Sequence, residues 1–169
     1  MRFRTFCALG AALTCVLCAP ATASPRDPDA SHIYFAADAG YLVSPGGGGS
    51  GSIVTAGVGY RLDRYFAIEG GYAGIFADGA SASGVYIDGF VYQPLGRYSP
   101  LSVFATGGAS YIASGIQGGY GYSPNAFGFR GGAGIEWQFN DLWALRTTAR
   151  YQSTIKSAAV ISLGLTAHF

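Results

Sequence analysis

Apolar side chains alternate with small or polar ones along most of the chain after residue 31. The clearest run ends the sequence, where small or polar residues separate Ile161, Leu163, Leu165, Ala167 and Phe169. Successive residues of a strand point to opposite faces, so a period of two predicts a strand with one apolar and one polar face. The same pattern predicts eight strands, at His32–Val43, Ile53–Leu62, Phe66–Ile75, Val85–Gln93, Leu101–Ile112, Phe127–Phe139, Leu142–Gln152 and Ala158–Phe169.

Short and long connections alternate between these strands. The segments Leu62–Phe66 and Phe139–Trp143 each place three turn residues, one of them Asp, between two apolar residues. Three-residue turns would set Glu136 opposite Arg146, which keeps like faces together and brings opposite charges side by side. The longer loops are expected at the other ends of the strands, at Ser44–Ser52, Ala77–Ser83 and Ala113–Ala126.

The composition indicates where these strands lie. Charged residues make up 11% of the chain, and glycine accounts for 27 of its 169 residues, whereas about 25% charge is typical of soluble proteins. After the leader, no segment reaches the roughly 18 consecutive apolar residues of a membrane helix. Half-apolar strands with little charge instead predict an all-β fold, an eight-stranded antiparallel up-and-down transmembrane β-barrel.

The first 23 residues predict a secretory signal peptide. A basic start precedes the apolar run Phe6–Cys18, and Ala21–Ala23 offers a small-x-small cleavage site. Residues 24–31 would then form an N-terminal tail and residues 32–169 the barrel. All three cysteines fall in the leader, so the mature chain has no thiol chemistry, and its nearly neutral charge suggests no nucleic-acid partner. An exported barrel indicates the bacterial outer membrane.

Charges on the polar face indicate which side of the strands faces inward. A soluble barrel would turn its charges outward, but here three acids and three bases sit mid-strand among small residues. They suit the lumen of an eight-stranded barrel, which is just wide enough for side chains. The predicted salt-bridged plug consists of Asp38, Glu69, Arg130, Glu136, Arg146 and Arg150. A narrow passive pore for ions or small solutes stays open as the alternative.

The strand Val85–Gln93 is ambiguous, because Tyr86, Phe90 and Tyr92 share a face with Asp88. We expect Asp88 to point inward, since a carboxylate in lipid is costly, although the aromatic rings then also point inward.

Aromatic residues on the apolar face fall near the strand ends and predict two membrane-interface girdles. The periplasmic set is Tyr60, Phe66, Trp137, Phe139, Trp143 and Phe169, and the outer set is Tyr41, Tyr72, Tyr111, Phe129 and Tyr151.

Several stretches resemble the outer membrane protein A-type family of small barrels. They are Gly57–Leu62 with Ile68–Tyr72, Gly131–Trp137, Ala149–Gln152 and Leu163–Phe169. The resemblance covers essentially the whole mature chain. It implies a lumen blocked by ion pairs, with Glu69 and Glu136 in the acidic positions and Arg146 and Arg150 as candidate partners.

The same resemblance implies that Phe169 is the terminal signal read by the barrel assembly machinery, although Ala167 stands where Tyr is usual. No peptidoglycan-binding domain follows Phe169, so the cell-wall tethering of longer members is not expected.

The sequence offers little for catalysis. Lipid-modifying hydrolases pair a His with a Ser, but the two histidines, His32 and His168, fall at the periplasmic end, away from outer-leaflet lipid A. Two histidines are also too few for a metal site. We therefore expect no catalytic residue, metal or cofactor, and a lipid A-modifying hydrolase is the least favoured reading.

The sequence thus predicts a non-catalytic outer-membrane protein with a structural or adhesin-like role. Its expected partners are outer-membrane lipid and lipopolysaccharide, the barrel assembly machinery, and an extracellular ligand at residues 44–52, 77–83 and 113–126.

Overall fold

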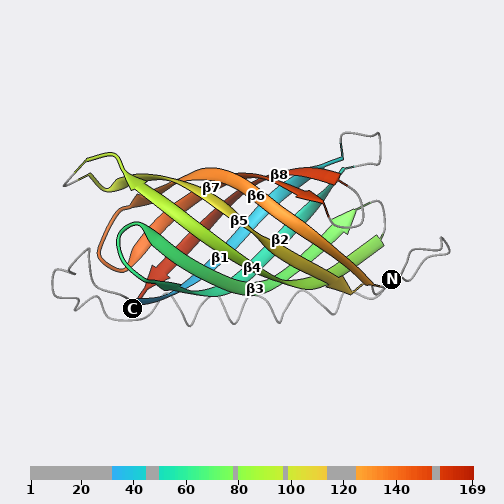
Figure 1. The fold of residues 1–169 in the computed structure, drawn as a ribbon. Coiled ribbons are helices and arrows are strands. Elements are labelled where there is room, and N and C mark those ends of the chain that lie inside the picture. Colours follow the sequence, from blue (N-terminus) through green and yellow to red (C-terminus); the bar gives the residue numbers. More distant parts are fainter. Residues whose placement is uncertain (1–31, 45–49, 78–79, 97–98, 114–124, 154–156) are drawn as a thin grey trace, which may run out of the picture.

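Eight antiparallel strands close into one barrel in a computed structural model that describes residues 32–44, 50–77, 80–96, 99–113, 125–153 and 157–169. Each strand pairs with its neighbours in sequence, and the last pairs with the first (Figure 1). The predicted signal peptide 1–23 and tail 24–31 lie outside the described residues. The strands are β1 His32–Val43, β2 Ser50–Arg61, β3 Phe66–Ala77, β4 Ala80–Pro94, β5 Leu101–Ala113, β6 Asn125–Gln138, β7 Trp143–Ser153 and β8 Ser157–His168.

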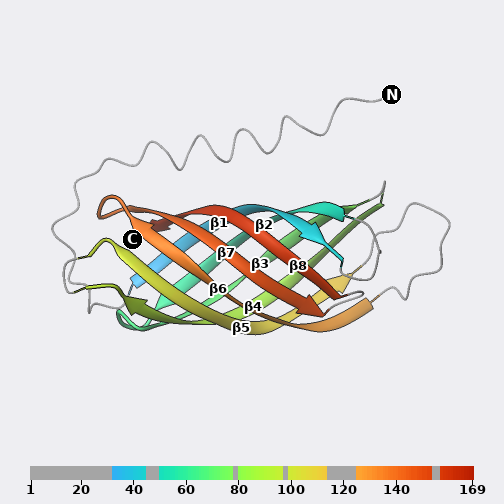
Figure 2. The ribbon, with the colours of Figure 1, turned by 90° about the horizontal axis from the view of Figure 1, so that it is seen from above.

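Closure is made by the pairing of β1 with β8, which runs from Tyr34 opposite His168 to Val43 opposite Ala159. The amide of Phe169 adds a hydrogen bond to the carbonyl oxygen of Ile33 at 2.9 Å. The strands cross the long axis obliquely in both side views (Figures 1 and 2). Because the sheet closes on itself, it presents no unpaired edge.

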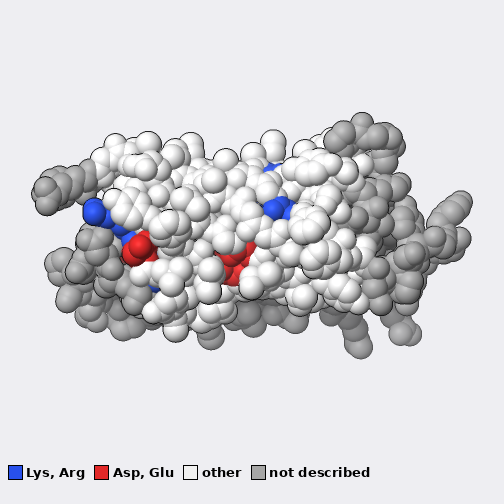
Figure 3. Space-filling view, viewed as in Figure 1, with Lys and Arg blue, Asp and Glu red and all other residues white. Residues whose placement is uncertain are grey.

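The two faces of the strands differ as the alternation predicts. Large apolar side chains point outward and are about half exposed, as at Ile87, Leu163 and Phe129. The outer surface shows few charged atoms in the view of Figure 3. In the part of the chain that the structure describes, no helix is long and apolar enough to cross a bilayer.

The inward placement of Asp88 is confirmed. Its side chain is buried in the lumen together with Tyr86, Phe90 and Tyr92, while Val85 and the other aliphatic residues of β4 point outward. The lumen therefore has to accommodate three aromatic rings from one strand.

The two predicted tight turns have the same structure. The side chain of Asp63 accepts hydrogen bonds from the amides of Tyr65 and Phe66 at 2.7 and 2.8 Å. Asn140 accepts equivalent bonds from Leu142 and Trp143 at 2.9 and 2.7 Å. These side-chain caps explain why each connection is short. The connections β2–β3, β4–β5 and β6–β7 lie at one end of the barrel, called here the short-turn end (Figure 1).

Several strands extend beyond their predicted limits. β2 begins at Ser50. β3 ends at Ala77 and β4 begins at Ala80, so much of the predicted loop 77–83 is paired sheet. Small residues such as Ala and Ser give little strand signal alone, but pairing with a neighbouring strand satisfies their backbone groups. The remaining loop positions, 45–49, 78–79 and 114–124, lie outside the described residues.

Inward glycines allow strands and lumen side chains to approach closely. A Cβ placed on Gly108 would overlap the carbonyl oxygen of Ile87 and the carboxylate of Asp88, and would lie 2.7 Å from the Asp88 Cα. Gly107 points outward, and a Cβ there would meet no atom within 4 Å.

This difference predicts opposite effects for neighbouring substitutions. Gly108→Ala should lower the free energy of unfolding by about 1–3 kcal/mol, because backbone must shift to admit the methyl group. Gly107→Ala should leave it unchanged or raise it by up to about 1 kcal/mol, since Ala suits a strand better than Gly. Urea unfolding in micelles measures both, and equal effects would contradict the close approach at Gly108.

Candidate functional site

The centre of the lumen is organised by one guanidinium group. Arg146 on β7 is fully buried and contacts two carboxylates, with its Nη2 at 3.0 Å from Asp38 Oδ2 and its Nη1 at 2.8 Å from Glu69 Oε2. Its Nε also donates to Asp38 Oδ1 at 3.4 Å. Three separate strands, β1, β3 and β7, are thereby joined through one side chain.

Neighbouring hydroxyl groups hold the two carboxylates in place. Thr55 donates a hydrogen bond to Asp38 Oδ2 at 3.0 Å, and the Tyr86 hydroxyl donates to Glu69 Oε1 at 2.9 Å. All of these groups are buried. Such a charge-assisted network is favourable inside a protein only when its members are well paired, as they are here.

Nearer the short-turn end, Glu136 pairs with Arg61 at 3.3 Å and accepts a hydrogen bond from the Tyr92 hydroxyl at 3.3 Å. The Arg61 guanidinium also stacks 3.9 Å from the centre of the Tyr92 ring. The backbone register does set Glu136 opposite Arg146. The ion pair nevertheless goes to Arg61, because Arg146 reaches across the lumen to Asp38 and Glu69, so the expected pairing of Glu136 with Arg146 or Arg150 is corrected.

Farther from the short-turn end, two arginines share one carboxylate. Arg130 Nη2 and Arg150 Nη1 lie 3.1 and 3.7 Å from the same atom, Asp88 Oδ2. The Arg130 guanidinium lies 4.1 Å from the centre of the Tyr86 ring, and that ring belongs to the tyrosine that supports Glu69. The two groups of charges are thus linked through Tyr86.

These eight side chains form what we call the lumen network. The structure places all six residues predicted from the sequence in it and adds Asp88 and Arg61. Within the described chain, the network balances four carboxylates with four guanidinium groups. It consists of Asp38, Glu69, Asp88, Glu136, Arg61, Arg130, Arg146 and Arg150.

Aromatic rings fill the lumen on the β4–β5 side. Phe90, Tyr92 and Phe104 pack together with ring centres 5.4–6.0 Å apart. A small void between Asp38 and Arg150 leaves no room for a water molecule. Ion pairs and packed rings therefore occupy the middle of the lumen.

Several buried polar atoms have no hydrogen-bond partner among the described residues. They include Asp88 Oδ1, Arg150 Nε and the hydroxyls of Thr148 and Ser162, which lie opposite each other on β7 and β8. Buried groups of this kind commonly bind ordered water. The wall beside the lumen network is accordingly polar.

The two histidines meet where β1 and β8 close the barrel. His32 Nε2 lies 3.0 Å from His168 Nδ1, and His168 is buried beside Tyr34. In the described part of the chain, no group of three or more His, Cys, Asp or Glu residues is arranged to hold a metal ion. These histidines thus form a structural contact at the seam.

The predicted interface aromatics lie on the outer surface, most of them near strand ends, whereas Tyr72 lies in the middle of β3. Trp137 and Phe139 pack with ring centres 5.9 Å apart at the short-turn end, and Phe169 contacts Phe35 at 5.6 Å. Trp143 is half-buried. The exposed members of the set are Tyr41, Tyr60, Phe66, Tyr72, Trp137, Phe139 and Tyr151.

Comparison with known proteins matches this geometry. The family model for the outer membrane protein beta-barrel domain matches residues 9–169. The fold is similar to Neisserial surface protein A (16% identity, TM-score 0.67, covering 83% of this chain and 100% of that one). It is also similar to the N-terminal barrel domain of Pseudomonas aeruginosa OprF (13% identity, TM-score 0.65, covering 83% of this chain and 100% of that one). A third similar structure is Ail of Yersinia pestis (13% identity, TM-score 0.52, covering 85% of this chain and 100% of that one). No curated protein matches the chain in sequence.

The geometry predicts that Arg146 stabilises the barrel only together with its partners. Arg146→Leu should lower the free energy of unfolding by about 3–5 kcal/mol, because two buried carboxylates lose their counter-charge. Neutralising them as well, in the triple variant with Asp38→Asn and Glu69→Gln, should restore much of the loss. Urea midpoints in micelles test this, with the exposed turn substitution Arg64→Leu as the control. A triple variant no more stable than the single one would contradict the proposed pairing.

Proposed function

This chain belongs to the outer membrane protein beta-barrel domain family, and from that membership we propose that it is a non-catalytic structural barrel that also makes surface contacts. It is a small outer-membrane β-barrel with buried salt bridges in its lumen. The finer role is our inference. It rests on the ion pairs and packed rings inside the lumen, and on the composition of the loops at the end opposite the short turns.

The observation that supports the structural role is the set of contacts that cross the lumen. Arg146 joins three strands across the interior, and the aromatic rings of Phe90, Tyr92 and Phe104 fill the space beside it. Such a barrel suits a structural role in the envelope better than a transport role. The contacts that cross the lumen would have to break before a solute could pass.

The surface role rests on the loop sequences. Residues 44–52, 77–83 and 113–126 contain no Lys or Arg, and the longest loop carries Tyr120 and Tyr122 among glycines. Tyrosines combined with glycines and serines make adaptable contacts. Ail has been solved with the heparin analogue sucrose octasulfate. Here the three loops carry no basic residue and the fourth connection at that end, 154–156, carries only Lys156, which does not suit a heavily sulfated ligand. We therefore favour an uncharged protein or glycan surface.

Export and assembly complete the proposal. Residues 1–23 direct secretion, residues 24–31 form a tail, and Phe169 is the signal read by the barrel assembly machinery. The aromatic girdles anchor the barrel at both interfaces, where outer-membrane phospholipid and lipopolysaccharide are its lipid partners.

A narrow pore is the second candidate, and one observation favours it. Asp38 and Arg150 line the same small void, so Arg150 has a second carboxylate close to its present partner, Asp88. Movement of Arg150 between them would rearrange the polar wall near Thr148 and Ser162.

Planar-bilayer recording separates the plug from the pore. The folded protein should show no discrete conductance, because the lumen network and aromatic rings block the path. Arg146→Leu should increase leakage if the plug is the barrier. Discrete openings in the unmodified protein that disappear in Arg150→Met would overturn the plug in favour of the pore.

The surface role predicts a loop-specific loss of adhesion. Bacteria that display the barrel should adhere to cultured epithelial cells, and Tyr120→Ser with Tyr122→Ser should reduce adhesion while sparing folding. Heat-modifiable migration on gels monitors folding, and Tyr65→Ser in the opposite short turn is the matched control. Equal adhesion of both variants would remove the role assigned to this loop. A change in the mass of added lipid A would instead support an enzyme.

A further inference from the structure

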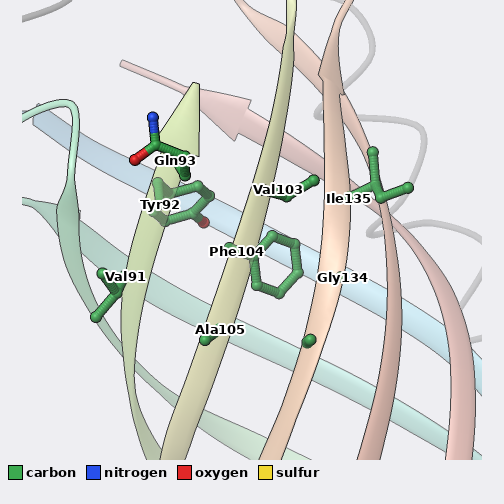
Figure 4. A pocket seen from close by; sticks show the side chains of 9 residues that line it. Val91, Tyr92, Gln93, Val103, Phe104, Ala105, Gly134 and Ile135 are labelled. Atoms are coloured by element: carbon green, nitrogen blue, oxygen red, sulfur yellow. The ribbon is translucent and has the colours of Figure 1, made fainter. Parts of the chain in front are cut away.

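A groove of about 670 Å³ crosses the outer wall of the barrel over β4, β5 and β6 (Figure 4). Its outward-facing lining is apolar except for one amide, that of Gln93. No charged side chain lines it among the described residues. The outward residues are Val91, Gln93, Val103, Ala105, Ala133 and Ile135.

The groove exists because the outward residues here are small. Val91, Ala105 and Ala133 lie directly opposite one another on the three strands. The next outward row is Gly89, Gly107 and Gly131, also in direct register. Elsewhere small outward residues lie next to large ones, as at Ala37 and Ala56, which pair with Leu165 and Tyr72.

The groove has a rigid floor. Tyr92 and Phe104 lie beneath it on the inner side of the wall, with ring centres 5.4 Å apart. Gly134 makes this possible, because a Cβ there would overlap the Phe104 ring. A floor of packed rings does not collapse into the space above, so the groove is preformed.

The position of the groove points to its occupant. Its lining runs from Gln93, beside the β4–β5 connection at the short-turn end, to the row of Val91, Ala105 and Ala133, and the glycine row is the next outward row on these strands. Trp137 on β6 and Phe139 just after that strand lie next to the groove and have the character of interface residues. The groove is also continuous with the apolar belt that contacts membrane lipid. Short turns face the periplasm in such barrels, so the groove opens to the periplasmic leaflet.

We propose that this groove binds one acyl chain of a phospholipid from the periplasmic leaflet, with the Gln93 amide near its ester or headgroup region. A lipid chain matches an uncharged, largely apolar groove on the lipid-facing wall of the barrel. Lipid A belongs to the outer leaflet, at the opposite end of the barrel from the groove, so a periplasmic-leaflet phospholipid is the better match. The inference rests on the position of the barrel in the membrane and not on the plug or the surface role. A failed test of either role would therefore leave the inference unaffected.

Native mass spectrometry of the folded barrel in detergent tests the site, with palmitoyl-oleoyl phosphatidylethanolamine as the probe. The wild-type protein should retain one phospholipid. Ala105→Phe with Ala133→Phe fills the groove and should weaken retention by about tenfold or more, because many methylene contacts are lost. The matched control is Ala37→Phe with Ala56→Phe, an outward, directly opposed pair on β1 and β2, which should retain the lipid as the wild type does.

Three results would overturn the proposal. They are equal retention by the groove variant and the control, preferential retention of added lipid A, and a dimer mass that only the groove variant loses, which would make a second copy the occupant. Heat-modifiable migration checks folding. If the double variant does not fold, Ala105→Leu narrows the groove more gently and should shift retention in the same direction.

Discussion

The interior of this barrel depends on Arg146 and the two carboxylates that it contacts. An eight-stranded barrel encloses a space that side chains must fill, and burying a single charge in that space would be costly. The contacts of Arg146 with Asp38 and Glu69 fill the space with side chains and also pair the buried charges. The remaining lumen charges are arranged around this centre. Tyr86 connects it with the group around Asp88, and Tyr92 supports the pair of Glu136 and Arg61.

The strand pattern made the fold predictable, since period-two alternation over eight segments and low charge leave few other arrangements. The facing of β4 followed from the cost of placing Asp88 in lipid. The choice of ion-pair partners inside the lumen was harder to predict from the sequence. Register alone set Glu136 opposite Arg146, but long arginine side chains reach across the barrel, and partner choice depends on distances that no local pattern encodes. Arg61 was missed as a partner because it ends its strand, and the prediction used only charges in the middle of strands.

Glycine has two separate uses in this wall. On the inner face, Gly108 and Gly164 leave space for the carboxylates of Asp88 and Asp38. On the outer face, Gly89, Gly107 and Gly131 make room in the lipid-facing surface. The sequence showed that glycine was abundant, but only the register of β4, β5 and β6 shows that three outward glycines form one row.

The seam between β1 and β8 joins the two strands farthest apart along the polypeptide. Contacts of such large sequence separation form late, because the chain entropy of ring closure must be lost before they contribute. Until β8 docks, both flanking strands expose unsatisfied backbone groups that hydrocarbon cannot solvate. An incomplete sheet of this topology therefore has to be shielded from lipid at its two edges. When the last strand pairs with the first, all backbone groups along both edges become hydrogen-bonded within the barrel.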